Sequence, residues 1–232
     1  MEINMNINHQ LVRIFCEIDD FCKEFDEYTK HHFLENGSPK KRRGPACALS
    51  MSEIMTILVL FQMIRFRDFK TFYCHYLQPI WKPYFPKIPS YQRFVELIKL
   101  AIFPLTLFVQ LRSGKKAGLF YIDSTCLPVC HLKRQKQHRM FEEIAKFGKT
   151  SVGWFFGLKL HLVTNDKGEL IAFKITQGNC SDCKAAESLL SSLQGLAFGD
   201  KGYIGKDLFE KLFSQGLKLI TRKRKNMKNV PP

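Results

Sequence analysis

The sequence lacks an uninterrupted apolar run of the length that crosses a membrane. Its longest apolar stretches, residues 54–64 and 100–109, are interrupted by Gln62 and Pro104 and fall short of the roughly 18 residues required. The Asn-rich start, residues 1–10, has no basic segment followed by an apolar core, which a secretory signal would have. We therefore expect a cytoplasmic protein without a membrane partner.

Acidic side chains are scarce relative to basic ones. The chain of 232 residues carries 36 Lys and Arg against 21 Asp and Glu, a formal net charge of +15. With 45% hydrophobic and 13% aromatic residues it has ample material for a packed core, which excludes a wholly disordered chain. The commonest partner of so basic a cytoplasmic protein is nucleic acid, and a generally cationic surface is the alternative.

A dense cysteine framework is also missing. The eight cysteines are scattered, which fits reduced thiols better than disulfides. A zinc site assembled from Cys180, Cys183, Cys126, Cys130 and His131 is conceivable, but neither cysteine pair has a partner pair at a ribbon spacing.

The first half of the chain has helical periodicity. Apolar residues recur every three to four positions over residues 11–28, and Ser50 with Glu53 forms a capping-box pattern before the apolar run 54–64. Ser90 can cap a further helix that ends near Phe103, before Pro104. The polar, Gly-containing stretch 112–118 then predicts a boundary between a helical region, residues 1–112, and a second domain, residues 118–232.

Beyond this boundary the periodicity changes to alternation. Residues 119–123 predict a short buried strand, and residues 154–163 and 170–176 predict an antiparallel hairpin around a polar turn. A helix capped by Ser181 or Asp182 follows, and then a strand, a helix and a strand up to residue 221. This order predicts an α/β fold, a mixed sheet with flanking helices.

Two acids, Asp123 and Asp200, each end an apolar run. A carboxylate at the end of a buried strand needs a cation, a donor or solvent. Two such groups on neighbouring strand ends can share divalent cations, and paired ions activate water and stabilise the leaving oxygen of a phosphodiester. The alternative is local capping, of Ser124 by Asp123 and of the turn before Gly202 by Asp200.

Several separated motifs occur in one order: Tyr-Ile-Asp-Ser at 121–124, followed by segments 128–131, 148–149, 153–161, 165–169, 178–179 and 198–204. In these motifs the chain resembles bacterial insertion-sequence transposases of the DDE type, most closely insertion-sequence family nine-eight-two. The resemblance extends from about residue 121 to residue 229 and implies a ribonuclease-H-like catalytic domain. It matches the first two acids of the triad to Asp123 and Asp200.

The resemblance also implies the activity. The acids would hold two Mg²⁺ ions, with Mn²⁺ as a substitute, to cut DNA at the element ends and join the 3′-hydroxyl to target DNA. The partners would be DNA and a second copy of the chain in an active homodimer, associated with the nucleoid. The third acid of the family, a Glu, lies on a helix beyond the stretch 219–229, where this sequence has only Val230, Pro231 and Pro232. We therefore expect a chain truncated at its C-terminus.

Basic residues supply a DNA-binding surface. Phosphate contacts by Lys and Arg give affinity without sequence choice. The candidates are Lys40, Lys41, Arg42 and Arg43 between two helices, Lys133, Arg134, Lys136 and Arg139 after the first acid, and Lys201 beside Asp200. Tyr203 is a candidate for DNA contact or packing.

Three functions remain open at this point. The first is the DNA transposase, and the second is a catalytically inactive DNA-binding remnant without the third acid. The third is another phosphodiesterase or nuclease that uses the same two Asp residues, against which the lack of a further clear acid or base counts. Asp182 lies in a motif of the family, but a helix N-cap explains it more simply.

Overall fold

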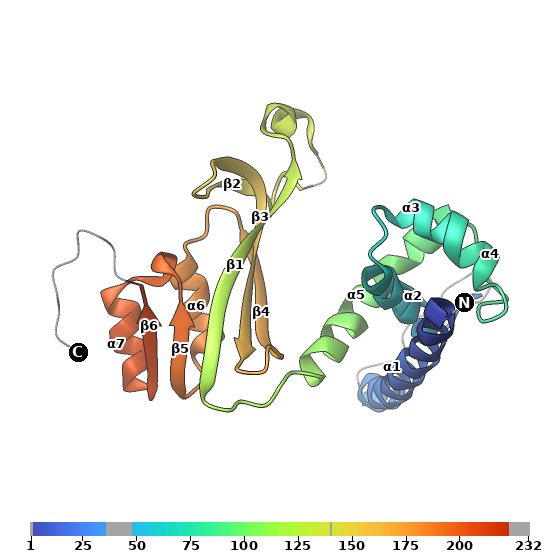
Figure 1. The fold of residues 1–232 in the computed structure, drawn as a ribbon, viewed down its shortest axis with the longest axis horizontal. Coiled ribbons are helices and arrows are strands. Elements are labelled where there is room, and N and C mark those ends of the chain that lie inside the picture. The colour runs from blue at the N-terminus through green and yellow to red at the C-terminus, as the bar shows by residue number, and fades with distance from the viewer. Residues whose placement is uncertain (1, 36–47, 140, 223–232) are drawn as a thin grey trace. The chain divides into compact units, whose positions relative to one another are not determined.

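The computed structural model describes residues 2–35, 48–139 and 141–222 (Figure 1). The four basic candidates Lys40, Lys41, Arg42 and Arg43 lie outside the described residues. The chain divides into two compact units, Met1–Leu111 and Arg112–Pro232, which we call the helical unit and the sheet unit.

Helices form all the regular structure of the helical unit in its described part. They are α1 (Glu2–Glu35), α2 (Met51–Ile64), α3 (Phe69–Thr71), a π-helical segment (Phe72–Leu77), α4 (Gln78–Ile80) and α5 (Tyr91–Leu111). The predicted capping box of α2 is present. The Glu53 amide donates to Ser50 Oγ (3.1 Å) and the Ser50 amide donates to Glu53 Oε2 (2.7 Å), which satisfies two backbone donors at the helix start.

Helix α5 corrects the expectation of an end near Phe103. It continues through Pro104 to Leu111, because Pro104 is buried on the same face as Phe94 and Ala101, and this packing outweighs the lost backbone hydrogen bond. With 21 residues and a mean hydropathy of 1.9, α5 has the length and composition of a membrane span, which the interrupted run had not suggested. Of its apolar window 22% is buried, and Phe94, Leu97 and Ala101 belong to the core of the helical unit.

The sheet unit contains the remaining strands and helices. They are β1 (Leu119–Cys130), β2 (Lys146–Lys149), β3 (Trp154–Asn165), β4 (Leu170–Gln177), α6 (Asp182–Leu190), β5 (Gly195–Gly199), α7 (Lys206–Ser214) and β6 (Leu217–Thr221), with 3₁₀ segments at Leu132–Gln137 and Lys201–Tyr203. Strands β3 and β4 form the predicted hairpin. The Gly168 amide donates to the Asn165 carbonyl (3.0 Å) and closes its turn.

The sheet is mixed, as the order of elements predicted. Strand β3 pairs antiparallel with β1 along one edge and with β2 and β4 along the other. Strand β5 lies parallel between β1 and β6, and helices α6 and α7 make the two crossover connections. The α/β fold class is therefore confirmed: a mixed sheet with flanking helices, preceded by a unit whose described residues form only helices and loops.

Aliphatic side chains join the two helices to the sheet. Helix α6 contributes Ala186 and Leu190, helix α7 contributes Leu212, and all three are fully buried against strand residues such as Phe120 and Ala197. This core fixes the start of α6 and the ends of β1 and β5 relative to one another.

Strand β1 corrects the prediction that the first strand ends at Asp123. It continues to Cys130, because residues 124–130 keep pairing with β3 after β5 has ended. Pro128, which has no amide hydrogen, lies where the register shifts before Cys130, a position that strands tolerate. We call the projection formed by residues 126–159 the arm (Figure 1).

Candidate active site

Asp123 and Asp200 each lie two residues beyond the last pair of the ladder between β1 and β5. The parallel register pairs Leu119 with Leu196 and Tyr121 with Phe198, so the same offset places Asp123 opposite Asp200. Neighbouring strands are about 4.8 Å apart, so both backbones meet at this point. That the two acids act together stays a prediction.

Both side chains also belong to the same face of the sheet. The rings of Tyr121 and Phe198, two residues earlier on each strand, stack with their centroids 5.6 Å apart. Asp200 keeps an extended backbone (φ −78°, ψ −174°), so alternation places it on the side of Phe198, as it places Asp123 on the side of Tyr121. The two carboxylates therefore extend from one face and are exposed to solvent.

Each carboxylate makes the local contact that the capping alternative predicted. Asp123 Oδ1 accepts a hydrogen bond from the Ser124 amide (2.8 Å), and Asp200 Oδ1 accepts one from the Gly202 amide (2.7 Å). These bonds use one oxygen of each group. Because a carboxylate has about four lone-pair sites, the local contacts and the binding of a cation are compatible.

A buried tyrosine lies among the acids. Tyr203 is 1% exposed, so of the two roles that the sequence left open for it, the structure shows packing in the core. Burial raises the pKa of Tyr203 well above its usual value, and the negative charges of Asp182, Asp123 and Asp200 raise it further. Although Ser124 lies near its hydroxyl, that hydroxyl forms no hydrogen bond of normal geometry with any described residue. The Tyr203 hydroxyl is thus within electrostatic range of three carboxylates.

Asp182 is the third of these acids, and its role differs from the predicted N-cap. Ser181 is the N-cap of α6, since its hydroxyl accepts from the Lys184 amide (3.4 Å). This leaves the Asp182 carboxylate free to extend toward the sheet. Its Oδ1 accepts hydrogen bonds from Ser124 Oγ (3.2 Å) and from Lys159 Nζ (3.1 Å).

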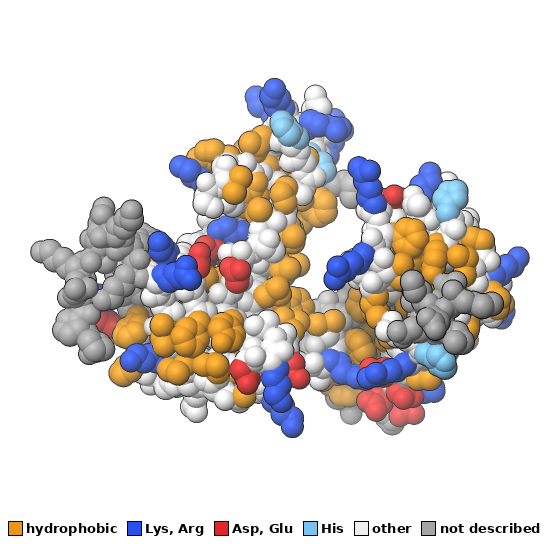
Figure 2. Space-filling view, viewed as in Figure 1, with side chains coloured by type: hydrophobic (Ala, Val, Ile, Leu, Met, Phe, Trp, Pro, Cys, Tyr) orange, Lys and Arg blue, Asp and Glu red, His pale blue; other side chains and the backbone are white. Residues whose placement is uncertain are grey.

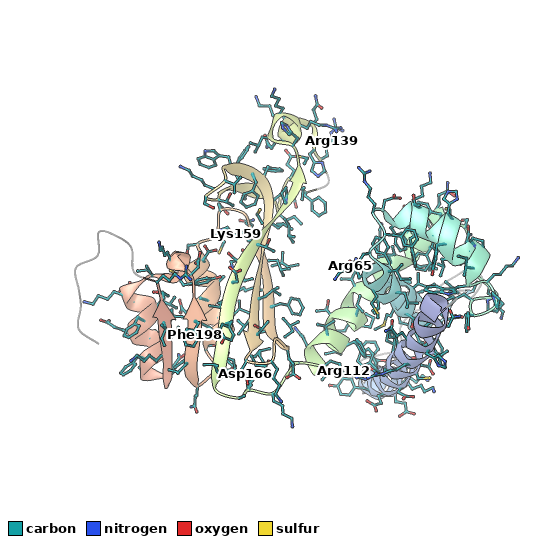
Figure 3. All side chains as sticks on the ribbon, in the orientation of Figure 1. Arg65, Arg112, Arg139, Lys159, Asp166 and Phe198 are labelled. Carbon is teal, nitrogen blue, oxygen red and sulfur yellow. The ribbon has the colours of Figure 1, made fainter. Side chains whose placement is uncertain are left out.

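Strand β3 supplies the basic partners of Asp182. Lys159, only 13% exposed in its side chain, donates to Asp182 and also to the Cys180 carbonyl (3.0 Å) (Figure 3). His161 is fully buried, and its Nε2 is 2.9 Å from the Thr176 hydroxyl. Its Nδ1 stands 4.0 Å from Asp182 Oδ1 without a hydrogen bond. Burial lowers the pKa of His161, so the imidazole is neutral at pH 7.

Gly202 leaves room between two of the acids. A Cβ atom at this position would lie 2.9 Å from Asp182 Oδ2 and 2.9 Å from Asp200 Oδ1. These distances are shorter than normal contacts, so any side chain here would displace both carboxylates. The glycine therefore keeps a space that is lined by carboxylate oxygens from α6 and from the end of β5.

The chemistry of these donors suits a hard divalent cation. Mg²⁺ and Mn²⁺ prefer carboxylate oxygens as ligands. The three acids supply such oxygens, and the ammonium group of Lys159 forms an ion pair with one of them, Asp182. In the described parts of the chain, no three Asp, Glu, His or Cys side chains already stand close enough to hold an ion. Asp123 and Asp200 are exposed and supply the oxygen ligands that such a cation prefers.

The basic candidates of the sheet unit occupy two places. Lys133, Arg134, Lys136 and Arg139 are exposed near the tip of the arm, where the sequence predicted a loop and the structure has a 3₁₀ segment. Figure 2 shows basic side chains at this tip and acidic ones at the end of β5. Arg139 lies at the tip, far along the arm from Lys159 (Figure 3). Only Lys201, directly after Asp200, is beside the acids.

Sequence reasoning missed Asp182, Lys159 and Ser124 as members of this cluster. The sequence did show that Lys159 and His161 share one face of the predicted hairpin. No pattern in the neighbouring residues, however, indicates that this face lies next to the start of α6. The contact between Asp182 and Ser124 joins residues 58 positions apart, which only the packing of α6 on the sheet produces.

Comparisons with known proteins agree with this picture. Residues 113–231 match the family model described as "Transposase DDE domain". Among solved structures, the chain is similar to a chain of the cryo-EM piggyBac transposase synaptic complex with hairpin DNA, with 13% identity and a TM-score of 0.47. That match covers 94% of this chain and 50% of the other, so the present chain spans about half its length. The curated proteins gave no match. Since the family match covers more than half of the sequence, the chain belongs to the DDE transposase domain family.

Proposed function

We propose that this protein is a DNA transposase that cuts phosphodiester bonds at insertion-element ends and joins the 3′-hydroxyl to target DNA. The single observation that supports this most is the parallel register of β1 and β5, because the same offset, continued by two residues, would bring Asp123 opposite Asp200. The motifs of the sequence favour insertion-sequence family nine-eight-two. We expect the active form to be a homodimer in the cytoplasm, bound to the nucleoid.

Asp123 and Asp200 would hold divalent cations, Mg²⁺ or in its place Mn²⁺, through their exposed oxygens. When bound, such ions lower the pKa of water and stabilise a leaving oxygen. The chain itself contributes placement. The ladder from Leu119 to Tyr121 fixes one acid, and the 3₁₀ segment after β5 fixes the other through the Gly202 amide.

The exposed Lys133, Arg134, Lys136 and Arg139 of the arm would contact the DNA backbone. Their charge gives affinity and no choice of sequence. Lys201 would contact the phosphate nearest to the acids because it follows Asp200 directly. Lys40, Lys41, Arg42 and Arg43 would bind the element ends together with the helical unit.

Cleavage of end-labelled DNA tests the proposal. Duplexes taken from the DNA that flanks the coding sequence would be incubated with the full chain in Mg²⁺, Mn²⁺ or EDTA. We expect nicking that requires the metal and falls by at least about 10²-fold in Asp123→Asn and Asp200→Asn, because each loses a charged oxygen ligand. Asp166→Asn, in the exposed turn between β3 and β4, is the control and should cleave normally.

The outcomes separate the candidate functions. Nicking that persists in both active-site variants would contradict the two-Asp site. Salt-sensitive DNA binding without any nicking would favour the inactive remnant. This outcome is worth testing because, among the described residues, no three metal-binding side chains lie close together.

A further inference from the structure

The hairpin of β2 and β3 in the arm carries large apolar side chains in solvent. Val152 at its turn is 97% exposed, Trp154 is 60% exposed and Phe147 is 45% exposed. We propose that this hairpin binds an unpaired base of DNA, with the indole of Trp154 stacked on the base and Lys149 at the adjacent phosphate. The inference rests on the proposed function, because it names the state of the DNA that the arm would hold.

Hydrogen bonds fix the shape of this hairpin turn. The Thr150 amide donates to the Gly153 carbonyl (2.8 Å), and Thr150 Oγ1 accepts from the amides of Val152 (3.2 Å) and Gly153 (3.3 Å). Gly153 has a φ of +149°, a conformation that other residues rarely adopt. The exposed side chains are thus held on a defined turn, so a ligand that binds them has little backbone left to order.

A cation accompanies the exposed indole. The antiparallel register pairs Lys149 with Trp154, and Lys149 Nζ lies 5.7 Å from the centroid of the ring, within the range of a cation–π contact. Since the Trp154 side chain is still 60% exposed, the opposite face of the ring is open to a ligand. A nucleotide offers a flat base and a phosphate, and an indole beside an ammonium group can bind both.

The charge of the arm favours DNA over an apolar protein partner. The arm carries seven Lys and Arg against two Glu. Figure 2 shows hydrophobic and basic side chains intermixed over it. A second copy of the chain would bring the same positive charge to this surface and would be repelled, whereas the phosphates of DNA would be attracted.

Trp154 also belongs to the face of the sheet from which the acids extend. Leu162 lies eight positions after Trp154 on β3, so alternation places both side chains on one face, and Leu162 pairs with Asp123. At about 3.3 Å per residue, this separation is at most about 26 Å. Nucleotides of one DNA strand rise about 3.4 Å each, so a DNA strand along this face would place the stacked base within about eight nucleotides of Asp123.

Two oligomers of equal length separate stacking from charge attraction. One is a thymidine oligonucleotide, and the other has the same sugars and phosphates without bases. In fluorescence anisotropy the wild-type full chain should bind the thymidine oligomer roughly 5- to 150-fold more tightly, the range for stacking on one base. Because Trp81 is only 1% exposed, quenching of tryptophan emission by the thymidine oligomer would report on Trp154.

Substitutions of the ring test the stacking itself. Trp154→Leu keeps an apolar side chain but removes the ring, so it should bind both oligomers equally, with the affinity of the wild type for the baseless one. Trp154→Phe should keep a preference for bases but lose the quenching. Phe213→Leu, which removes a 61% exposed ring of α7, is the matched control and should behave as the wild type does. Circular dichroism would verify that each variant is folded.

The outcomes separate this inference from the proposed function. Equal binding of the two oligomers by the wild type, or a preference that survives Trp154→Leu, would overturn the stacking. So would Trp154 emission that changes with protein concentration in the absence of DNA, because the hairpin would then contact a second copy of the chain. Metal-dependent nicking without a preference for bases would leave only the proposed function standing. A preference that depends on Trp154, without nicking, would support the stacking and count against the proposed cleavage.

Discussion

The two units of the molecule reach stability by different means. The helical unit packs aromatic rings against one another, and Phe72, Tyr73, Trp81 and Phe94 are almost fully buried there. The Tyr73 and Phe94 ring centroids are 4.9 Å apart, within the range in which such pairs add stability beyond their area. The sheet unit instead packs mostly aliphatic side chains, Leu above all, which bury less surface per residue than aromatic rings.

The polar interior shows the same contrast. In the helical unit the buried polar residues are Ser52 and Thr56, and the Thr56 hydroxyl donates to a carbonyl of its own helix. The sheet unit buries His161 and Asn165 completely and sets Lys159 against Asp182. Buried charge and unpaired polar atoms cost stability, so a unit that keeps them does so for a reason other than folding. This contrast is what we expect if the proposed chemistry takes place in the sheet unit.

The largest effect on this comparison is expected from Phe94→Ala. Removing this fully buried ring should lower the free energy of unfolding of the helical unit by about 3–5 kcal/mol, through reduced burial and a cavity among neighbouring rings. The chain has only two tryptophans, so in a Trp154→Phe background the fluorescence of Trp81 follows denaturation of the helical unit alone.

The matched variant in the other unit is Leu190→Ala, which empties a fully buried position of α6. It should cost the sheet unit about 2–5 kcal/mol and leave the Trp81 transition where it was. A Trp81 transition that moves equally in Leu190→Ala would show that the units unfold as one, and the comparison would then lose its basis.

The next effect concerns the basic tip of the arm. Replacing Lys133, Arg134, Lys136 and Arg139 together with Gln should weaken DNA binding and flatten its dependence on salt. The slope of log K against log salt should become shallower by about 0.9 for each DNA phosphate that the arm no longer neutralises. Fluorescence anisotropy with labelled duplex DNA at several salt concentrations would measure it. Lys167→Gln, in the turn between β3 and β4, is the control, and an equal weakening there would mean that the arm has no special role.

The smallest effect is a pH dependence from His161. Burial lowers the pKa of His161 below the ordinary 6.5. The positive charges of Lys159 and Lys174 lower it further, whereas the negative charge of Asp182 raises it. The unfolded chain then binds more protons, so the stability contributed by the neutral imidazole is present above pH 6.5 and is lost as the pH falls below it. Each unit of pKa difference is worth about 1.4 kcal/mol.

Urea denaturation of the wild type and of His161→Gln at pH 8, 7, 6 and 5 would measure this contribution. The wild type should lose stability toward pH 5 more steeply than the variant. Parallel curves for the two proteins would show that the histidine does not titrate between the folded and unfolded states in this range.

Local patterns in the sequence predicted much of the fold. The capping box of Ser50 and Glu53, the hairpin of β3 and β4, and the helix and strand order from α6 to β6 depend on neighbours within a few residues, and each is present. The ends predicted at Pro104 and Asp123 were wrong. Helix α5 continues because Pro104 packs in the helical unit, and strand β1 continues because it keeps pairing with β3.

The candidate site divides in the same way. Asp123 and Asp200 stood out because each follows an apolar run, which is a local signal. Asp182 did not, since an acid near a helix start has a ready local explanation. Its contacts with Ser124 and Lys159 depend on where α6 packs, and no local pattern encodes that placement.

The short ladder between β1 and β5 has a dynamic consequence. The first residues of β1, up to Tyr121, are hydrogen-bonded to strands on both sides, whereas residues beyond Asp123 pair with β3 alone. Amide exchange with deuterated water should accordingly be slow before Asp123 and faster after it, within one continuous strand. The acid stands at the border between a segment paired on both sides and one paired on a single side, so we expect the arm to bend while the carboxylate keeps its position.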